Sequence, residues 1–161
     1  MIVALDVDYR ETGVITGCVE FAAWSDAAPA REHVVPSHAA PAEYAAGRFF
    51  ERELPYLLAA LAGIAPELVV IDGNVWLANG AKGLGAHLHA AIGVPVVGVA
   101  KNPFRGSPAI PVIRGKSAKP LLVTAVGTDA QEAAEHVRAM HGEFRIPTLL
   151  KRADALARGH Q

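Results

Sequence analysis

The sequence predicts an α/β fold in which a mixed central sheet, opened by an antiparallel hairpin, is flanked by helices. Three observations lead to this prediction. Residues 2–9 alternate between two faces, as a β-strand does, and turn residues follow them. Residues 48–61 carry apolar side chains at helical spacing. Two short apolar runs, residues 68–71 and 94–100, enclose a segment long enough for a crossover helix, which indicates buried and parallel strands.

The amino-terminal part predicts three antiparallel strands. One face of the first strand carries Val3, Leu5, Val7 and Tyr9, and the other carries Ile2, Ala4, Asp6 and Asp8. Turn residues 10–13 predict that residues 14–21 return as the second strand of a hairpin. Residues 32–35 can then supply a third strand after a loose segment over residues 24–30.

The remaining elements follow in order along the chain. The helix over residues 48–61 has the apolar positions Phe50, Leu54, Leu57, Leu58 and Leu61. Residues 80–92 predict the crossover helix, where Gly83 and Gly85 allow close packing or an irregular start. After it we expect a hairpin over residues 110–125 and a helix from about residue 129 to residue 141. The chain then ends in a basic tail, which contains Lys151, Arg152 and Arg158.

Length and composition predict one domain over residues 1–161. The chain has 161 residues, of which 52% are hydrophobic and 19% charged, and its mean hydropathy is +0.25. This is enough apolar sequence for one core and too little for two ordinary domains. The net charge is −1, so any nucleic acid contact must use a local basic patch.

The same composition bears on cellular location. The single cysteine, Cys18, excludes an internal disulfide and a thiolate zinc cluster, and it fits a reducing compartment. Asp6 comes too early for a signal peptide, and no apolar run approaches the roughly 20 residues that span a bilayer. We therefore expect a cytoplasmic protein without membrane contact, and no obligate protein partner is evident.

Three carboxylates occupy positions where a carboxylate is costly without a partner. Asp6 lies within a strand, Glu53 borders the apolar face of a helix, and Asp72 ends a buried strand just before Gly73. Burying an ionised carboxylate costs several kcal/mol unless a cation or an arginine compensates it. Sites made only of oxygen ligands favour Mg²⁺ or Mn²⁺, which activate water and neutralise charge on a phosphate. The three acids therefore suggest hydrolysis of a phosphodiester.

Each acid also has a simpler interpretation. Asp72 can serve only to form a turn, and Asp6 can face solvent on a half-exposed hairpin. Glu53 can pair with Arg48 or Arg52 on the helix surface. Asp8 shares the strand face of Asp6 and is a minor candidate for an extra oxygen ligand.

Four stretches of the sequence resemble the endonuclease V family. They are residues 4–8 (ALDVD), Tyr44-x-x-Gly47 followed by Arg52-Glu53, residues 68–73 (LVVIDG), and residues 94–101 (VPVVGVAK). With the segment over residues 153–155, the resemblance covers essentially the whole chain. It implies a ribonuclease H-like fold and an endonuclease that cuts near deaminated purine, in deoxyinosine-containing DNA or inosine-containing RNA.

The resemblance also implies roles for particular residues. Asp6, Glu53 and Asp72 would be catalytic and would hold Mg²⁺, with Mn²⁺ as a possible substitute. Lys101 would contact the phosphate or stabilise charge near the cleaved bond. Tyr44 would separate the strands as a wedge, because an aromatic ring can stack in the gap left by a displaced base. Gly47 and Gly73 are further candidates for contact with the nucleic acid.

The chain departs from the family pattern at several points. Glu43, Ala45 and Ala46 surround Tyr44 where the family has prolines. Ala78 replaces a histidine, and residues 124–128 lack a Gly-His pair that helps at the metal site. Because Asp6 comes so early in the sequence, we also expect no counterpart here of the helix that usually precedes the first aspartate. His87 matches a common family position, but we expect it to pack rather than to bind metal.

These departures leave other functions open. The main alternative to an active endonuclease is a catalytically weakened homologue that binds nucleic acid and lacks the family histidine. A third interpretation is an interaction module whose Phe49, Phe50 and Trp76 belong to a core or an interface. Basic residues suggest a track for the DNA or RNA strand: Lys82, Lys101, Arg105, Arg114, Lys116 and Lys119.

Overall fold

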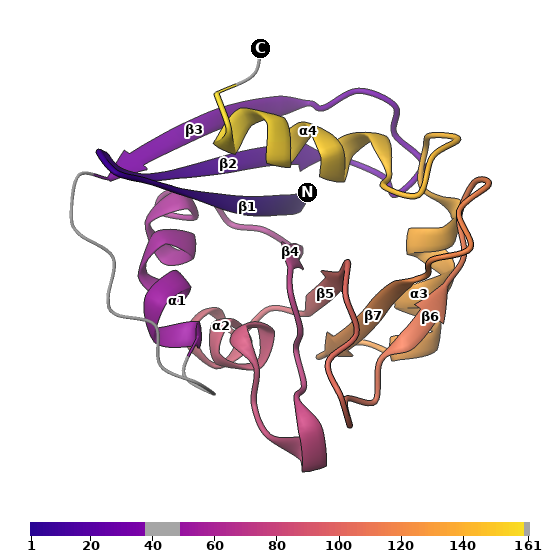
Figure 1. The fold of residues 1–161 in the computed structure, drawn as a ribbon. Helices are drawn as coiled ribbons and strands as arrows, with labels where there is room; N and C mark the ends of the chain where they lie inside the picture. Colours follow the sequence, from indigo (N-terminus) through magenta and orange to yellow (C-terminus); the bar gives the residue numbers. More distant parts are fainter. Residues whose placement is uncertain (38–48, 160–161) are drawn as a thin grey trace.

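A computed structural model describes residues 1–37 and 49–159 of the chain. Within these residues, seven strands form one sheet in the order β3-β2-β1-β4-β5-β7-β6 (Figure 1). The strands are β1 (Ile2–Arg10), β2 (Gly13–Phe21), β3 (Arg31–Ser37), β4 (Leu68–Asp72), β5 (Val96–Ala100), β6 (Ile110–Val112) and β7 (Leu121–Val126). The helices are α1 (Phe49–Ala60), α2 (Leu84–Ile92), α3 (Ala130–Ala139) and α4 (Thr148–Ala157).

The sheet is mixed, as the sequence predicts. Strands β1, β2 and β3 pair antiparallel, and β1, β4 and β5 pair parallel. Strand β7 then runs antiparallel to both β5 and β6. The predicted amino-terminal hairpin, the third strand and the late hairpin are therefore all present.

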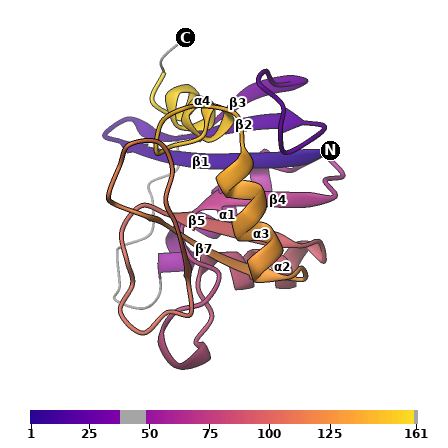
Figure 2. The same cartoon turned by 90° about the vertical axis from the view of Figure 1, so that its right-hand side faces the viewer.

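Two apolar clusters lie on opposite faces of the sheet. Helices α1 and α2 cover the face that includes Val3 and Leu5, and α3 and α4 cover the face that includes Ile2 and Ala4. Figure 2 shows α3 in front of the sheet and α4 across the hairpin of β1 and β2. The predicted division of the first strand into two faces is confirmed. None of the described helices is long and apolar enough to cross a membrane.

The apolar face predicted for α1 includes one residue that the structure leaves exposed. Leu57 and Leu61 are buried, and Phe50 and Leu54 pack at the edge of the cluster. Leu58 instead leaves 37% of its surface exposed. Successive helix residues are about 100° apart, so Leu58 is rotated away from the face that Leu54 and Leu61 share.

The basic tail predicted for the end of the chain is wrong, because this segment is helix α4. Its buried residues Leu149, Ala153 and Ala157 are four apart and form an apolar stripe. At Gly17 on β2, an added Cβ would lie 2.3 Å from the backbone oxygen of Ala153, so only glycine allows this close approach. Arg152 also donates two hydrogen bonds to Glu32 on β3, at 2.8 and 2.6 Å.

The crossover from β4 to β5 begins irregularly, as its glycines suggest. A 3₁₀ turn over Ala78–Gly80 precedes α2, which starts at Leu84 rather than near residue 80. Gly98 on β5 lets the loop after β4 lie directly over the sheet, because an added Cβ would meet the backbone oxygen of Gly73 at 2.5 Å. The loop that leaves Asp72 is thereby held against β5.

Candidate active site

The three parallel strands bring three of the predicted site residues to one place. Leu5 on β1 pairs with Ile71 on β4, so the next residues, Asp6 and Asp72, lie side by side. Lys101 directly follows the neighbouring strand β5, and its Nζ lies 3.4 Å from Oδ2 of Asp72. A carboxylate pair and one ammonium group therefore meet at this edge of the sheet.

A narrow pocket opens beside these groups. It lies between the ends of β1, β4 and β5 and the start of α4. Its lining comprises Ala4, Leu5, Asp6, Val70, Ile71, Asp72, Val99, Lys101, Leu121, Ile146, Pro147, Leu150 and Ala153. The two aspartates and the lysine are its charged groups, and the remaining wall is apolar. The side chains of Asp72 and Lys101 are more than a third exposed, so solvent partly screens their charges.

Helix α1 adds Glu53 from the opposite face. Its side chain is only 8% exposed, and burial together with the charges of Asp6 and Asp72 raises its pKa to about 8. Burial and the charge of Asp72 raise the pKa of Asp6 to about 7, although Lys101 acts in the other direction. Because the charge of Asp72 acts on both Asp6 and Glu53, and that of Asp6 acts on Glu53, the three acids lie within electrostatic reach of one another.

Tyr9 and Arg52 surround Glu53. The guanidinium of Arg52 lies 4.0 Å from the centre of the Tyr9 ring, a cation–π contact, and its charge favours the ionised form of Glu53. Burial and the Glu53 carboxylate raise the pKa of the Tyr9 phenol. Arg52 therefore compensates Glu53 only in part, since the pKa of Glu53 stays well above its ordinary value.

A fourth carboxylate, Asp154, joins the site from α4. Its charge contributes to the raised pKa of Asp6, and its Oδ1 accepts a hydrogen bond from Nε of Arg158 at 2.9 Å. Residues 153–155 belong to the resemblance to the family, but the sequence pattern indicates no role for Asp154. The available signal was the spacing of Leu149 and Ala153, which predicts a packed helix with Asp154 beside its buried stripe.

The acids suit a divalent cation by charge and donor type. Mg²⁺ and Mn²⁺ prefer oxygen ligands. A divalent cation also offsets the repulsion between neighbouring carboxylates. In the part of the chain that the structure describes, no group of three or more acidic, histidine or cysteine side chains is placed so that it could hold a metal ion. The fit therefore rests on the electrostatics of Asp6, Glu53 and Asp72 rather than on preformed ligand geometry.

Gly73 and Thr124 shape the turn after Asp72. Gly73 has φ +143°, a conformation that favours glycine, and the hydroxyl of Thr124 accepts a hydrogen bond from the backbone N–H of Val75 at 2.8 Å. Thr124 begins the stretch that lacks the family Gly-His pair, and here it holds the loop that carries Asp72. A contact of Gly73 with nucleic acid stays a prediction.

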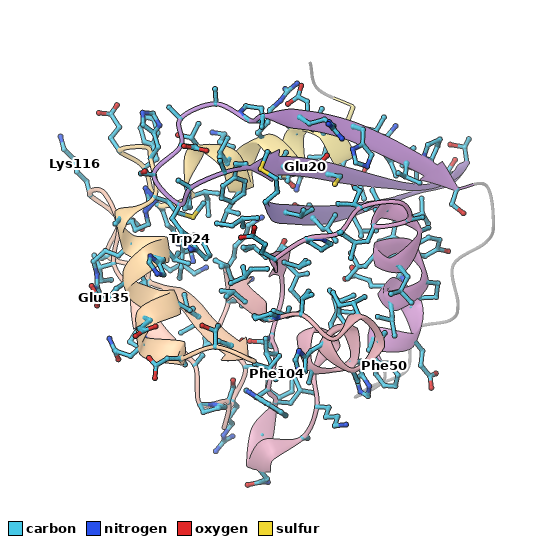
Figure 3. All side chains as sticks on the ribbon, turned by 180° about the vertical axis from the view of Figure 1, so that it is seen from behind. Glu20, Trp24, Phe50, Phe104, Lys116 and Glu135 are labelled. Carbon is cyan, nitrogen blue, oxygen red and sulfur yellow. The ribbon has the colours of Figure 1, made fainter. Side chains whose placement is uncertain are left out.

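The described histidines make packing and hydrogen-bonding contacts away from this site. His87 stacks on Phe50, with ring centres 3.6 Å apart, and Figure 3 shows Phe50 where α1 meets α2. Burial and the charge of Lys82 lower the pKa of His87. The ring of His136 stacks on Trp24, and Nδ1 of His89 lies 2.7 Å from the backbone oxygen of Val94. The contacts of His87 agree with the packing role expected for it.

The basic track needs one correction. Arg114 is buried, and its Nη2 donates to the backbone oxygens of Met140 and Gly142 at 3.0 and 2.8 Å, so it serves the fold rather than a strand. Lys82, Arg105, Lys116 and Lys119 are exposed, and Figure 3 shows Lys116 pointing away from the sheet. Tyr44 and Gly47 lie outside the described residues, as does the possible partner Arg48.

The aromatic residues proposed for an interface lie mostly inside the fold. Trp76 is partly buried and its indole N–H donates to the backbone oxygen of Ala125 at 3.0 Å. Phe50 packs against the cluster beneath α1 and α2. The side chain of Phe49 is outside the described part of the structure.

Comparison with known proteins gives a consistent result. The family model for Endonuclease V matches residues 1–129. Endonuclease V of Streptomyces avermitilis is 36% identical over 140 residues, which cover 71% of this chain and 60% of that protein. Endonuclease V of Rhodospirillum centenum is 30% identical over 142 residues, which cover 73% and 59%. The chain thus spans about 60% of the length of these relatives.

Solved structures show the same fold. The crystal structure of the Streptomyces avermitilis endonuclease V superposes with a TM-score of 0.78 at 30% identity, over 98% of this chain and 79% of that one. Human ENDOV gives a TM-score of 0.76 at 20% identity, over 98% and 82%. A Ciona intestinalis endonuclease V, solved with a 23mer DNA containing an inosine followed by a ribo-adenosine, gives 0.79 at 17% identity, over 98% and 83%. The ribonuclease H-like fold expected from the sequence is confirmed.

Proposed function

Because this chain belongs to the endonuclease V family, we propose that it is an endonuclease that hydrolyses a phosphodiester bond near a deaminated purine, with help from a divalent metal. The substrate would be a strand of DNA or RNA that contains deoxyinosine or inosine, and the biological role would be DNA repair. The DNA in the Ciona intestinalis complex contains an inosine, which supports this class of substrate.

The observation that carries the proposal is the convergence of Asp6, Glu53 and Asp72 from three different elements. The raised pKa values of Asp6 and Glu53, to which the charge of Asp72 contributes, mark a place where negative charge is concentrated and poorly compensated. Mg²⁺, or Mn²⁺ in its place, would be held by these three carboxylates, with Asp154 as a further oxygen donor. When bound, the metal supplies a Lewis acid that activates water and neutralises charge on the phosphate.

The other residues of the site bind and orient the strand. Lys101 would place its ammonium group against the scissile phosphate, where it stabilises the charge that grows during hydrolysis. Its present partner, Asp72, lies at 3.4 Å and both side chains are more than a third exposed, so the pair can open to admit a phosphate. Tyr44, with Gly47 and Gly73 nearby in the family pattern, would contact the displaced base.

Asp154 bears on the main alternative, a homologue that binds nucleic acid but cuts weakly. That alternative depended on the missing family histidine. Asp154, on helix α4, would supply a charged oxygen donor within electrostatic reach of Asp6. This fourth carboxylate favours an active nuclease.

The test is cleavage of matched, labelled DNA and RNA oligonucleotides, each with and without one inosine, in Mg²⁺ and in Mn²⁺. Asp72→Asn is the control, because it removes the charge and keeps the shape. We expect cutting that needs both metal and inosine and that is lost in the variant. Binding without cutting in either metal would favour the weakened homologue, and cutting that Asp72→Asn does not reduce would contradict the assigned site.

A further inference from the structure

Arg145 ties together three segments around the pocket. It lies in the connection between α3 and α4, and its side chain is partly buried. Its Nη2 donates hydrogen bonds to the backbone oxygens of Lys101 and, at 3.0 Å, of Pro120. Its Nε donates to the backbone oxygen of Lys119 at 3.0 Å. One guanidinium group therefore holds the end of β5, the start of β7 and the approach to α4.

These three segments carry or border the reactive groups. Arg145 fixes the backbone of Lys101 at the position from which its ammonium reaches Asp72. The next two residues after Arg145, Ile146 and Pro147, line the pocket beside the aspartates, and Pro147 directly precedes the helix that carries Asp154. Arg145 thus lies between the predicted phosphate contact and the fourth carboxylate.

We propose that Arg145 is a positioning residue for the nuclease site: it fixes the backbone of Lys101 relative to Asp72 and to the start of α4. The planar guanidinium reaches three carbonyl oxygens at once, which the single ammonium group of a lysine does not reproduce. This inference rests on the proposed function, because it assigns Lys101 to the phosphate. Misplacement of a reacting group by about 1 Å lowers a rate by roughly 100-fold, so such a tie has catalytic weight.

Arg114 offers a matched control for a purely structural role. Its guanidinium also donates to two backbone oxygens of the connection between α3 and α4, those of Met140 and Gly142. Unlike Arg145, it bonds to neither Lys101 nor the segment over residues 119–120. Both arginines therefore stabilise the connection between α3 and α4 through backbone oxygens. Of the two, Arg145 is the one that also bonds to Lys101.

The experiment compares Arg145→Lys with Arg114→Lys in steady-state cleavage of inosine-containing DNA, well below the unfolding temperature of each variant. We expect Arg145→Lys to lower kcat by roughly 10- to 100-fold with a smaller change in KM, and Arg114→Lys to keep kcat. Added guanidinium ion should restore part of the kcat of Arg145→Ala. Equal kcat values for both lysine variants, or no rescue, would overturn the inference.

Hydrogen exchange provides a readout that does not need cleavage. In Arg145→Lys the backbone amides over residues 99–102 should exchange faster than in the wild type, and in Arg114→Lys they should not. The same exchange in both variants would overturn the positioning role. If exchange rises in Arg145→Lys alone but the wild type does not cut, the proposed function is contradicted. The tie between Arg145 and Lys101 would then still stand.

Discussion

Asp6 and Glu53 are the two carboxyl groups of the site whose ionisation the fold disfavours. Burial and the charge of Asp72 raise the pKa of Asp6 to about 7, and burial with the charges of Asp6 and Asp72 raises that of Glu53 to about 8. At neutral pH without metal, each carboxyl group is therefore protonated in a large fraction of the molecules. A cation that binds must displace these protons. Metal affinity and protein stability should consequently both depend on pH.

The sign of the stability effect follows from the raised pKa values. The ordinary values are 3.8 for Asp and 4.5 for Glu, so the unfolded chain loses these protons before the folded chain does. Between about pH 4 and about pH 8, the folded state binds more protons, and the free energy of unfolding falls as pH rises. Urea denaturation at a series of pH values, with a chelator present, measures this fall.

Two comparisons separate this effect from other titrations. Glu53→Gln should flatten the fall toward pH 8, because the buried group no longer ionises. Mg²⁺ should raise the unfolding temperature more at pH 8 than at pH 5, since protons compete with the metal at low pH. An unchanged pH dependence in the glutamine variant would contradict the raised pKa assigned to Glu53.

Single residues also show what a sequence can and cannot indicate. Asp6, Glu53 and Asp72 stood out because each sits in an apolar context, where an unpaired charge is costly. Arg114 and Arg145 carry no such signal. Both bond to backbone oxygens that are distant in sequence, so an arginine expected to bind a strand proves structural, and another that received no attention lies beside the site.

At the scale of elements, helix α4 contributes to the wall of the pocket and carries Asp154, but the sequence pattern did not predict it. Its buried stripe is made largely of alanine, a residue that also occurs often in exposed helices and loops, and Lys151, Arg152 and Arg158 made the segment resemble a solvated tail. The partners that hold it, Gly17 and Glu32, lie more than 100 residues earlier. Only the tertiary structure brings them to this helix.

The close approach of α4 to β2 makes Gly17 a sharp test of this element. Gly17→Ala places a methyl group against the backbone of Ala153, which should lower the free energy of unfolding by about 1–3 kcal/mol. It should also reduce cleavage measured well below the unfolding temperature, because the shifted helix carries Asp154. Chemical denaturation and single-turnover cleavage measure the two effects.

Ile113→Ala serves as the control, since Ile113 leaves 51% of its surface exposed and lies just after β6, outside both apolar clusters. It should leave cleavage unchanged, and its effect on stability should be small. Wild-type stability and activity in Gly17→Ala would show that α4 moves freely without consequence for the site, which contradicts the role assigned to this contact.

At the scale of the whole molecule, the placement of Asp6 beside Asp72 depends on which strands are neighbours in the sheet. The sequence predicts the hairpin, the crossover and the late strands with nearly correct bounds, because strand alternation and helical spacing are local signals. It does not by itself state that β1 pairs with β4, and this pairing places Asp6 beside Asp72. The side-by-side placement of the acids is therefore a property of the fold, on which the residue pattern gives only indirect information.

Mn²⁺ titration by electron paramagnetic resonance tests the central claim that the converging carboxylates hold a divalent metal. The wild type should bind Mn²⁺ saturably, and Asp6→Asn and Asp72→Asn should each weaken binding by at least about 10-fold. Asp8→Asn should bind like the wild type, because Asp8 does not line the pocket that Asp6 and Asp72 line. Binding that the Asp6 and Asp72 variants leave unchanged would contradict the account.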